Sequence, residues 1–518
     1  MDGTPFAKAQ VSTVRTSDKA LLAGLVLASF LFLYFHLFVS FSTPLWTGGD
    51  EIIFLADASR MLDGQVLYRD FAQMTFPATD LLYFSAFKVF GAQMWIPNIL
   101  LLLVGVTLVC LSYFLGERLN LGKLALLPPL LFLSLVYRNR LDATHHWFSA
   151  LATMAAVAVL ITRRTLPRIA TAGALCGVAA SFTQSLGLLI LMAFALFLYW
   201  EARRTSSPRK SLVTNVCSLV ACFAFMVFAA TCYFIWAAGF QKFIDNTVLF
   251  SIRYYPSYSG ANSWQGYMVG VSEFLHWRRI TDFAGFVLIH ALLPLVYLLF
   301  FVRYRRDSAK QPAEPWDRLM FVNLVGIFSL LSVTAAPTWA RLYYVSLPAL
   351  ILFAWFLKSE AKAGRVLSMI LFASTSILLV ALPVAKQLHH PDNLDLPTGR
   401  TAFLNKEAYD RYRWAASETR PGDYFFGGLF PDFYFILNLR NPGPVPFITP
   451  YDYTRPAEVQ AVLDGLQKHQ VKIVLWTPSL DAPENPQFDH LGPLRAYIRS
   501  HYHVAEDLPQ FEVWFRND

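Results

Sequence analysis

Long apolar segments alternate with short polar connections along most of the chain. A bilayer core of roughly 30 Å is crossed by about 20 helical residues, and a helix satisfies its own backbone hydrogen bonds there. Segments of this kind predict about eleven transmembrane helices. They cover residues 20–41, 93–115, 124–137, 147–161, 169–182, 186–200, 212–240, 283–302, 319–336, 342–357 and 366–384. The pattern predicts a polytopic α-helical membrane protein.

Composition supports this interpretation. Of 518 residues, 55% are hydrophobic and only 15% are charged, and the mean hydropathy is +0.42, which excludes an ordinary soluble protein. The net charge of +8 comes from short clusters of Lys and Arg between apolar segments. Such clusters are typical of membrane topology signals and not of a nucleic-acid-binding face. Membrane lipid is the expected surrounding, and no nucleic-acid partner is expected.

The positive clusters also predict the orientation of the chain. They precede the first apolar segment and recur at every second connection, as around residues 163–168 and 303–310. Because cytoplasmic loops carry the excess of Lys and Arg, the N-terminus is expected in the cytoplasm of an inner-membrane protein. Residues 169–200 would form a single helix of roughly 48 Å. Two short spans meeting near Gln184 fit the charge pattern better, and the resulting odd number of spans leaves the tail outside.

Three polar regions are expected on the outer side: residues 42–92, the aromatic-rich residues 241–282, and the tail. Residues 1–385 are interpreted as the membrane domain and residues 386–518 as a small extracytoplasmic α/β domain. The tail combines short apolar segments with amphipathic ones, which predicts strands and helices packed together. The strands are expected at residues 423–427, 472–477 and 512–515, and the helices at residues 457–469 and 491–500.

The first outer loop carries the strongest chemical signal. Asp50 and Glu51 follow two glycines and precede residues 52–62, whose apolar positions have helical spacing, and Gly64 ends the segment. The pattern predicts an interfacial helix with both carboxylates in its first turn, where the helix dipole favours them. Asp50 is therefore either a helix N-cap or a general base close to the outer membrane surface. The string GGDE also begins a signature of nucleotide cyclases, but those need a cytosolic soluble domain, which excludes them.

This loop resembles the first outer loop of the GT-C membrane glycosyltransferases, and among them the protein O-mannosyltransferase and aminoarabinose-transferase group. The resemblance rests on Gly49-Asp50-Glu51, Met61-Leu62-Asp63-Gly64, Leu67-Tyr68-Arg69-Asp70-Phe71, Phe76-Pro77 and a second short helix at residues 79–90. It is specific over roughly residues 20–115 and extends weakly to the whole chain through the multi-span layout and the tail. It implies a GT-C-like fold, a polyprenyl-phosphate-linked sugar donor, and Asp50 as the base. Some relatives carry Lys-Pro-Pro where this chain has residues 75–78, so a lysine on the donor phosphate is missing here.

Another cation must therefore stabilise the departing phosphate. Arg138, Arg140 and Arg341 stand out because short outer loops seldom carry cations. Arg341 also lies in a segment that resembles an Arg-Tyr stretch of the family. Arg341, with Arg138 or Arg69, is the predicted donor-phosphate site, and the alternative is interfacial snorkelling.

Two further groups are candidates for substrate contact. Asp142, His145 and His146 lie between two apolar segments and are interpreted as acceptor contacts, polar anchors or ligands of a divalent metal ion. Tyr254 and Tyr255 could stack on a sugar or belong to an interfacial aromatic belt. The sequence requires no cofactor, and metal binding stays open.

The predicted protein is a glycosyltransferase, hexosyl or pentosyl, that moves a sugar from a polyprenyl-phosphate-linked donor to a hydroxyl of a glycan, lipid or protein acceptor on the outer face of the membrane. Asp50 would act as general base in a single displacement, with Glu51 orienting it. One alternative is a transporter or flippase of a lipid-linked precursor, which would place ionisable residues near span centres, whereas the acidic residues here lie mostly at ends and loops. The other alternative is a non-catalytic membrane scaffold.

Overall fold

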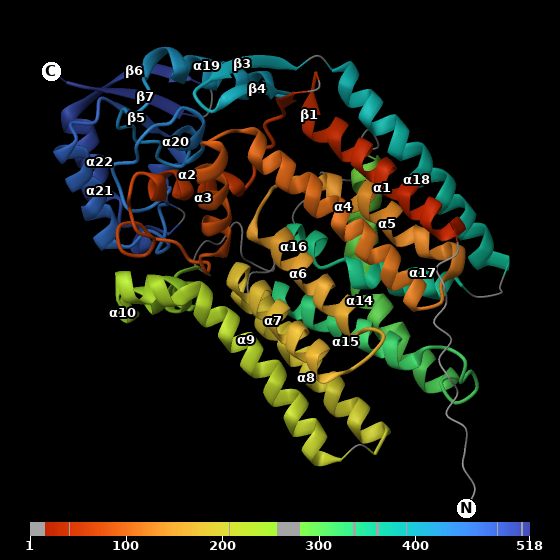
Figure 1. Cartoon of the computed structure of the whole chain (residues 1–518). Helices are drawn as coiled ribbons and strands as arrows, with labels where there is room; N and C mark the ends of the chain where they lie inside the picture. The colour runs from red at the N-terminus through yellow and green to blue at the C-terminus, as the bar shows by residue number, and fades with distance from the viewer. Residues whose placement is uncertain are drawn as a thin grey trace, which may run out of the picture.

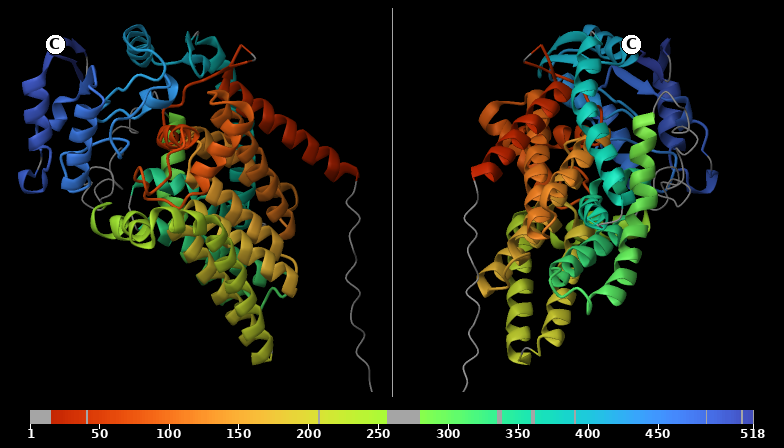
Figure 2. Two further views of the ribbon diagram at one scale, coloured as in Figure 1. Left: turned by 60° about the vertical axis from the view of Figure 1, so that its left-hand side comes forward. Right: turned by 90° about the vertical axis from the view of Figure 1, so that its right-hand side faces the viewer.

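A computed structural model describes residues 16–40, 42–206, 208–255, 280–334, 338–358, 362–389, 391–483, 485–508 and 511–517. The chain forms a helical bundle, and a tail of helices and strands lies at one end of it (Figure 1). The other end of the bundle is where α8 and α9 meet, far from the tail (Figure 2).

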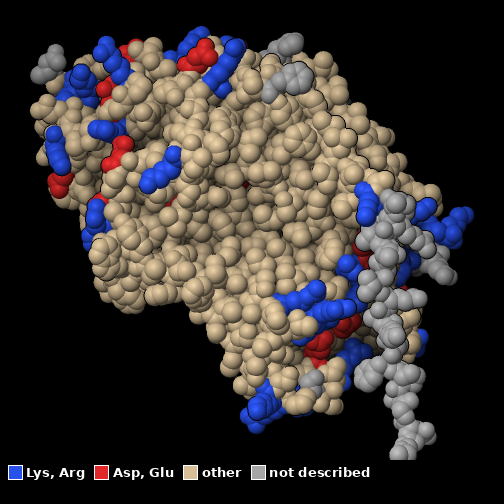
Figure 3. Space-filling view, in the orientation of Figure 1, with Lys and Arg blue, Asp and Glu red and all other residues tan. Residues whose placement is uncertain are grey.

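Within the described residues, seven helices are long and apolar enough to cross a membrane. They lie in α1 (Thr16–Leu37), α4 (Trp95–Arg118), α8 (Gln184–Arg204), α9 (Arg209–Ala238), α14 (Ile280–Asp307), α15 (Trp316–Val333) and α18 (Lys362–Leu388). Three shorter apolar helices are α6 (His145–Leu160), α7 (Leu166–Phe182) and α17 (Leu347–Leu357). Charged side chains gather at two ends of the visible face, with an uncharged belt between them (Figure 3). The chain is a multi-pass membrane protein, as its sequence predicts.

Several apolar segments are interrupted helices. The predicted break near Gln184 is present: α7 ends at Phe182, Thr183 is extended, and α8 begins at Gln184. Residues 124–137, expected as one span, instead form short turns, since Pro128 and Pro129 open a new helix and a π-helical turn follows it. These turns are η1 (Gly122–Leu126), α5 (Leu127–Leu131), η2 (Phe132–Val136) and η3 (Tyr137–Asn139). The expected span at residues 342–357 is likewise divided into α16 (Trp339–Tyr344) and α17.

The first outer loop folds between the bundle and the tail (Figure 1). A short antiparallel pair, β1 (Phe38–Val39) with β2 (Thr43–Pro44), leads into α2 (Glu51–Leu62) and α3 (Ala78–Phe90). Both helices agree with the sequence prediction, and α2 packs against α3 and the tail helix α20 (Asp432–Ile436). Gly64 follows α2 with φ +85°, a conformation that only glycine adopts readily.

The second outer region begins with three short helical segments. They are α10 (Phe240–Ile244), the π-helical turn η4 (Asp245–Leu249) and α11 (Phe250–Arg253). Residues 256–279, which include most of the aromatic residues noted in this region, lie outside the described part of the chain.

The tail holds two small sheets. In the first, β3 (Asp392–Leu396) pairs antiparallel with β4 (Gly399–Phe403), and in the second β5 (Ile473–Trp476), β7 (Phe511–Arg516) and β6 (Tyr502–Leu508) are antiparallel in the order β5-β7-β6. Its longer helices are α19 (Lys406–Glu418), α21 (Pro456–Lys468) and α22 (Gly492–His501).

One feature of the tail differs from the sequence analysis. Residues 423–427, predicted as a strand, form only isolated bridges, Tyr424 with Arg440 and Phe426 with Val474. The segment is cut short because the chain turns immediately afterwards, at Gly428 with φ +51°. Moreover, buried tail residues such as Phe433 belong to the same apolar cluster as the bundle. The tail is therefore joined to the bundle by continuous packing.

Candidate active site

A cavity of about 490 Å³ lies where the first outer loop meets the bundle. Its lining includes Asp50, His145, His146, Tyr255 and Arg341, five residues that the sequence analysis singled out. They come from the start of α2, the start of α6, the end of α11 and the short helix α16. Segments up to 290 positions apart in the sequence thus converge on one cavity, because the interrupted helices place polar residues at their breaks.

Asp50 is at the N-cap position of α2 but does not cap the helix. Its backbone is helical, with φ −65° and ψ −12°, and its side chain makes no capping hydrogen bond. The N-cap interpretation is therefore wrong, and the carboxylate is open to the cavity instead. The surrounding protein raises the pKa of Asp50 by desolvation, whereas the positive charges of Arg341 and Arg140 act in the opposite direction.

Glu51 lies behind Asp50 and is fully buried. Thr47 Oγ1 donates a hydrogen bond of 2.7 Å to Glu51 Oε1, while Oε2 is buried without a partner. Burial raises the pKa of the Glu51 carboxyl to about 7. Glu51 is outside the lining of the cavity, and its bond to Thr47 links the start of α2 to the preceding turn.

Asp142 is the third carboxylate of this region. The Tyr344 hydroxyl lies 2.7 and 2.8 Å from its two oxygens and donates to the carboxylate. Burial, and next the negative charge of Glu51, raise the pKa of Asp142 to about 8. A Cβ added to Gly49 would lie 2.5 Å from the Asp142 Cβ and would also collide with the Glu51 carboxylate. Glycine at position 49 is therefore what allows these acidic side chains to approach the start of α2.

Two arginines supply positive charge to the site. Arg341 donates a hydrogen bond to the Tyr255 hydroxyl, and its guanidinium lies 5.6 Å from the centre of the Tyr255 ring. Arg140 lies 4.6 Å over the Trp339 ring, and its Nε is buried without a hydrogen-bond partner. Its charge acts on both Asp50 and Asp142. Arg140 was singled out on its loop, but Arg138 was preferred to it.

Two residues predicted to bind the donor phosphate, Arg69 and Arg138, lie outside the lining of the cavity. Arg69 is on the exposed turn after α2 and forms an ion pair of 2.8 Å with Asp70. Arg138 lies within the turn Tyr137–Asn139, and its Nε donates to the Ser134 carbonyl at 2.9 Å. Arg140 is also outside the lining of the cavity, but its charge acts on Asp50 and Asp142. The role of these arginines in donor-phosphate binding stays a prediction.

Tyr254 also differs from its neighbour Tyr255. Its ring lies 5.7 Å from the guanidinium of Arg455, which belongs to the tail, and it is not part of the cavity lining. Of the two tyrosines proposed for substrate contact, only Tyr255 reaches the cavity.

The two histidines form an aromatic wall of the cavity. Their ring centres are 3.9 Å apart, and His146 stacks on Tyr344 at 4.6 Å. His145 Nδ1 is buried without a hydrogen-bond partner. Among the described residues, no group of three His, Cys, Asp or Glu side chains is arranged to hold a metal ion. The divalent metal considered from the sequence thus stays an untested prediction.

One contact was missed by sequence reasoning, and a second involves a residue that was expected either to contact substrate or to satisfy the helix break. The first is the pairing of Tyr344 with Asp142, although Tyr344 follows Arg341 by one helical turn and shares its face. The second is Gln184, whose Nε2 donates to the Met74 carbonyl at 2.9 Å and to the Thr247 carbonyl at 3.4 Å. Gln184 therefore fastens the first and second outer regions to the helix break.

Comparison with known proteins identifies structures of similar fold but no relatives by sequence. The sequence matches no protein-family model and no curated protein. Among solved structures, ArnT from Cupriavidus metallidurans bound to undecaprenyl phosphate is 12% identical, with a TM-score of 0.58 over 96% of this chain and 98% of that one. The arabinofuranosyltransferase AftD from Mycobacteria is 15% identical, with a TM-score of 0.49 over 96% of this chain and 40% of that one. The likeness to ArnT covers nearly the whole of both chains and shows that this chain has the fold of ArnT.

Proposed function

We propose that this chain transfers a sugar from a polyprenyl-phosphate-linked donor to an acceptor hydroxyl, and that the reaction takes place in the cavity of Asp50. The observation that carries the proposal is the convergence of an open carboxylate, Asp50, with a cation, Arg341, in one cavity. The ArnT structure, which has the same fold, was solved with undecaprenyl phosphate. This supports a donor of the same chemical class here.

The proposed step is a single displacement at the anomeric carbon. The acceptor oxygen forms a bond to that carbon while its proton passes to an Asp50 carboxylate oxygen. The bond between the anomeric carbon and the phosphate oxygen breaks, its electron pair stays on the phosphate, and the configuration inverts. Because desolvation by the protein around the cavity raises the pKa of Asp50, its carboxylate is a stronger base than one in water.

The departing phosphate gains negative charge as the bond breaks. Arg341, held by the Tyr255 hydroxyl, is in place to stabilise that charge, and Arg140 adds a second positive charge nearby. Leu188, Val248 and Ile252 line the same cavity, and an isoprenoid chain would lie against such apolar side chains. Glu51 and Asp142 are positioning residues in this scheme.

The proposal includes the placement in the membrane. We place the chain in an inner membrane with its N-terminus in the cytoplasm, about eleven spans, and the tail as an extracytoplasmic α/β domain. The acceptor is a glycan, lipid or protein hydroxyl, and the sugar is a hexose or a pentose. The reaction as written uses no cofactor, and the divalent metal is tested by assaying transfer after chelation and after adding the metal back.

The decisive experiment compares Asp50→Asn with wild type in liposomes that contain a radiolabelled polyprenyl-phosphate sugar and envelope extract. Removing a positioned general base is expected to lower the rate by roughly 10²–10⁴. Asp464→Asn is the matched control, because Asp464 is exposed on α21, outside the cavity, and its Oδ1 accepts a hydrogen bond from Gln460 of the same helix. Unchanged transfer by folded Asp50→Asn would contradict the enzymatic proposal and favour a transporter or scaffold.

A further inference from the structure

A second, larger cavity of about 570 Å³ lies farther along α2, between the first outer loop and the tail. Its lining includes Asp57, Arg60 and Asp63 of α2 and Tyr424, Arg440 and His469 of the tail. We propose that this outer cleft binds the saccharide portion of the acceptor, so that the acceptor class is a glycan. That the bound saccharide is an acceptor rests on the proposed function. Binding of a saccharide in the cleft does not require catalysis.

The side chains of the outer cleft favour a neutral, polyhydroxylated ligand. Both signs of charge are present and lie close together: Arg440 Nε is 3.6 Å from Asp63, and Arg60 interacts electrostatically with the buried Asp57. A polyanion would gain little from such a balanced surface. A guanidinium can instead donate hydrogen bonds to two neighbouring hydroxyls of a sugar, and a carboxylate can accept hydrogen bonds from two.

An aromatic platform completes the cleft. The Tyr424 and His469 rings stack with centres 3.7 Å apart and an angle of 13°, and the Arg440 guanidinium lies 6.0 Å over the Tyr424 ring. Flat rings beside hydrogen-bonding groups offer both an apolar face and polar edges. The volume is in the range of small-molecule sites, which occur preferentially between domains.

The outer cleft and the active-site cavity lie along one helix. Asp57 follows Asp50 by seven residues, which is close to two helical turns, so both are on the same side of α2 and about 10 Å apart along its axis. A saccharide of a few units that contacts Asp57 can therefore place its terminal hydroxyl beside Asp50.

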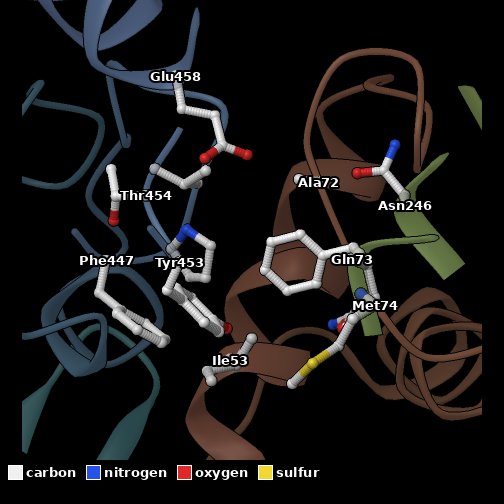
Figure 4. Close-up of a pocket in the computed structure, with 12 residues that line it drawn as sticks. Ile53, Ala72, Gln73, Met74, Asn246, Phe447, Tyr453, Thr454 and Glu458 are labelled. Carbon is white, nitrogen blue, oxygen red and sulfur yellow. Dashed lines mark hydrogen bonds between the residues drawn. The ribbon is translucent and has the colours of Figure 1, made fainter. Parts of the chain in front are cut away.

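A narrow pocket of about 50 Å³ shares one lining residue with each of the two sites. Figure 4 shows Phe447 and Tyr453 of the tail facing Ile53 and Met74 of the first outer loop across it. Met74 also lines the active-site cavity, and Pro446 lines both the narrow pocket and the outer cleft. In the proposed binding mode an acceptor passes the Met74 side chain, which is unbranched and adaptable.

A hydrogen-bonded link runs beside this pocket. Gln73 Nε2 donates to Asp57 Oδ2 at 3.0 Å, and Gln73 Oε1 accepts from the Met74 backbone N–H at 2.8 Å. Met74 in turn is held by Gln184 through its carbonyl. Asp57, which lines the outer cleft, is thus linked through Gln73 to Met74, which lines the active-site cavity.

The test is a direct binding measurement on the full chain in nanodiscs. The probe is the neutral oligosaccharide fraction released by mild acid from the envelope of the organism that carries the chain. Ala461→Trp fills the outer cleft from α21, where Ala461 lines it, and is expected to weaken binding at least about tenfold. Ala457→Trp, at an exposed position one turn earlier on the same helix, is the matched control and should bind like wild type.

Asp50→Asn separates binding from catalysis. It is expected to bind the oligosaccharides as tightly as wild type while it loses transfer. Absence of saccharide binding by wild type, or binding that Ala461→Trp leaves unchanged, would overturn the inference. Retention of the peptide or lipid fraction of the envelope in place of the saccharides would overturn it as well. Failure of the proposed function looks different, since transfer would then persist in Asp50→Asn whatever the cleft binds.

Discussion

The buried and the surface carboxylates around the first outer loop differ in their electrostatics, and burial raises the pKa of Asp57, which lines the outer cleft, to about 7. Toward the bundle, desolvation raises the pKa values of Asp50, Glu51 and Asp142. On the turn after α2, Arg69 holds the pKa of Asp70 below its usual value through a hydrogen-bonded ion pair, and Asp63 at the end of α2 lies beside Arg440. Paired carboxylates keep their charge and hold surfaces together. Desolvated ones bind protons more tightly, which is the property that proton transfer requires.

The largest expected effect on activity comes from removing Arg341, the cation that lines the active-site cavity beside Asp50. Arg341→Ala is expected to lower kcat by roughly 10²–10³, because it removes a preorganised charge from the departing phosphate. Arg341→Lys should recover part of the loss, since it keeps the charge but not the planar hydrogen bond to Tyr255. Steady-state transfer assays in liposomes measure both. A loss of less than twofold in Arg341→Ala would remove Arg341 from the mechanism.

The close approach of Glu51 and Asp142 to the start of α2 depends on glycine at position 49. Gly49→Ala places a methyl group against Asp142 and Glu51, so the carboxylates must separate, at a cost of about 1–3 kcal/mol in the free energy of unfolding. Thermal unfolding in detergent measures this cost. Gly24→Ala is the control, because a Cβ there meets nothing within 4 Å. Equal stability of the two variants would contradict the described packing.

The raised pKa values predict how stability depends on pH. Asp142 and Glu51 bind protons more tightly in the folded state, so their favourable contribution is complete below about pH 4 and is lost as the pH rises through about 7 for Glu51 and about 8 for Asp142. Asp142→Asn removes this dependence. Its Tm relative to wild type should therefore increase between pH 6 and pH 9, and a constant difference over that range would contradict the assignment.

The smallest expected effects are at the cations outside the cavity. Arg69→Ala and Arg138→Ala should change transfer by less than about twofold, because one lies in an exposed ion pair and the other donates to a backbone carbonyl. Arg140→Ala, two positions from Arg138, should have the larger effect. Comparing the three variants at fixed donor concentration decides which arginine serves the site.

Local signals made the helices of the first outer loop predictable. Gly64 marks the end of α2, apolar spacing marks its face, and the length of residues 169–200 required the break at Gln184. The choice between Arg138 and Arg140, or between Tyr254 and Tyr255, could not be predicted in the same way. Adjacent residues at a 3₁₀ turn or a helix end point in directions set by the packing of distant segments, such as Trp339 over Arg140 or Arg455 beside Tyr254. The tail strand at residues 423–427 failed for a similar reason, since the positive φ of Gly428 is not visible in hydrophobic alternation.

The most direct test of the account is the location of position 50 relative to the membrane and the carrier. Asp50→Cys, in a chain whose five native cysteines are replaced, is treated with a membrane-impermeant sulfonated maleimide in intact cells. Thr205→Cys, on an exposed connection predicted to be cytoplasmic, is the control and should react only after permeabilisation. The account predicts that Cys at position 50 reacts from outside and that added polyprenyl phosphate slows the reaction. Labelling that requires permeabilisation, or a rate that the carrier phosphate does not change, would contradict it.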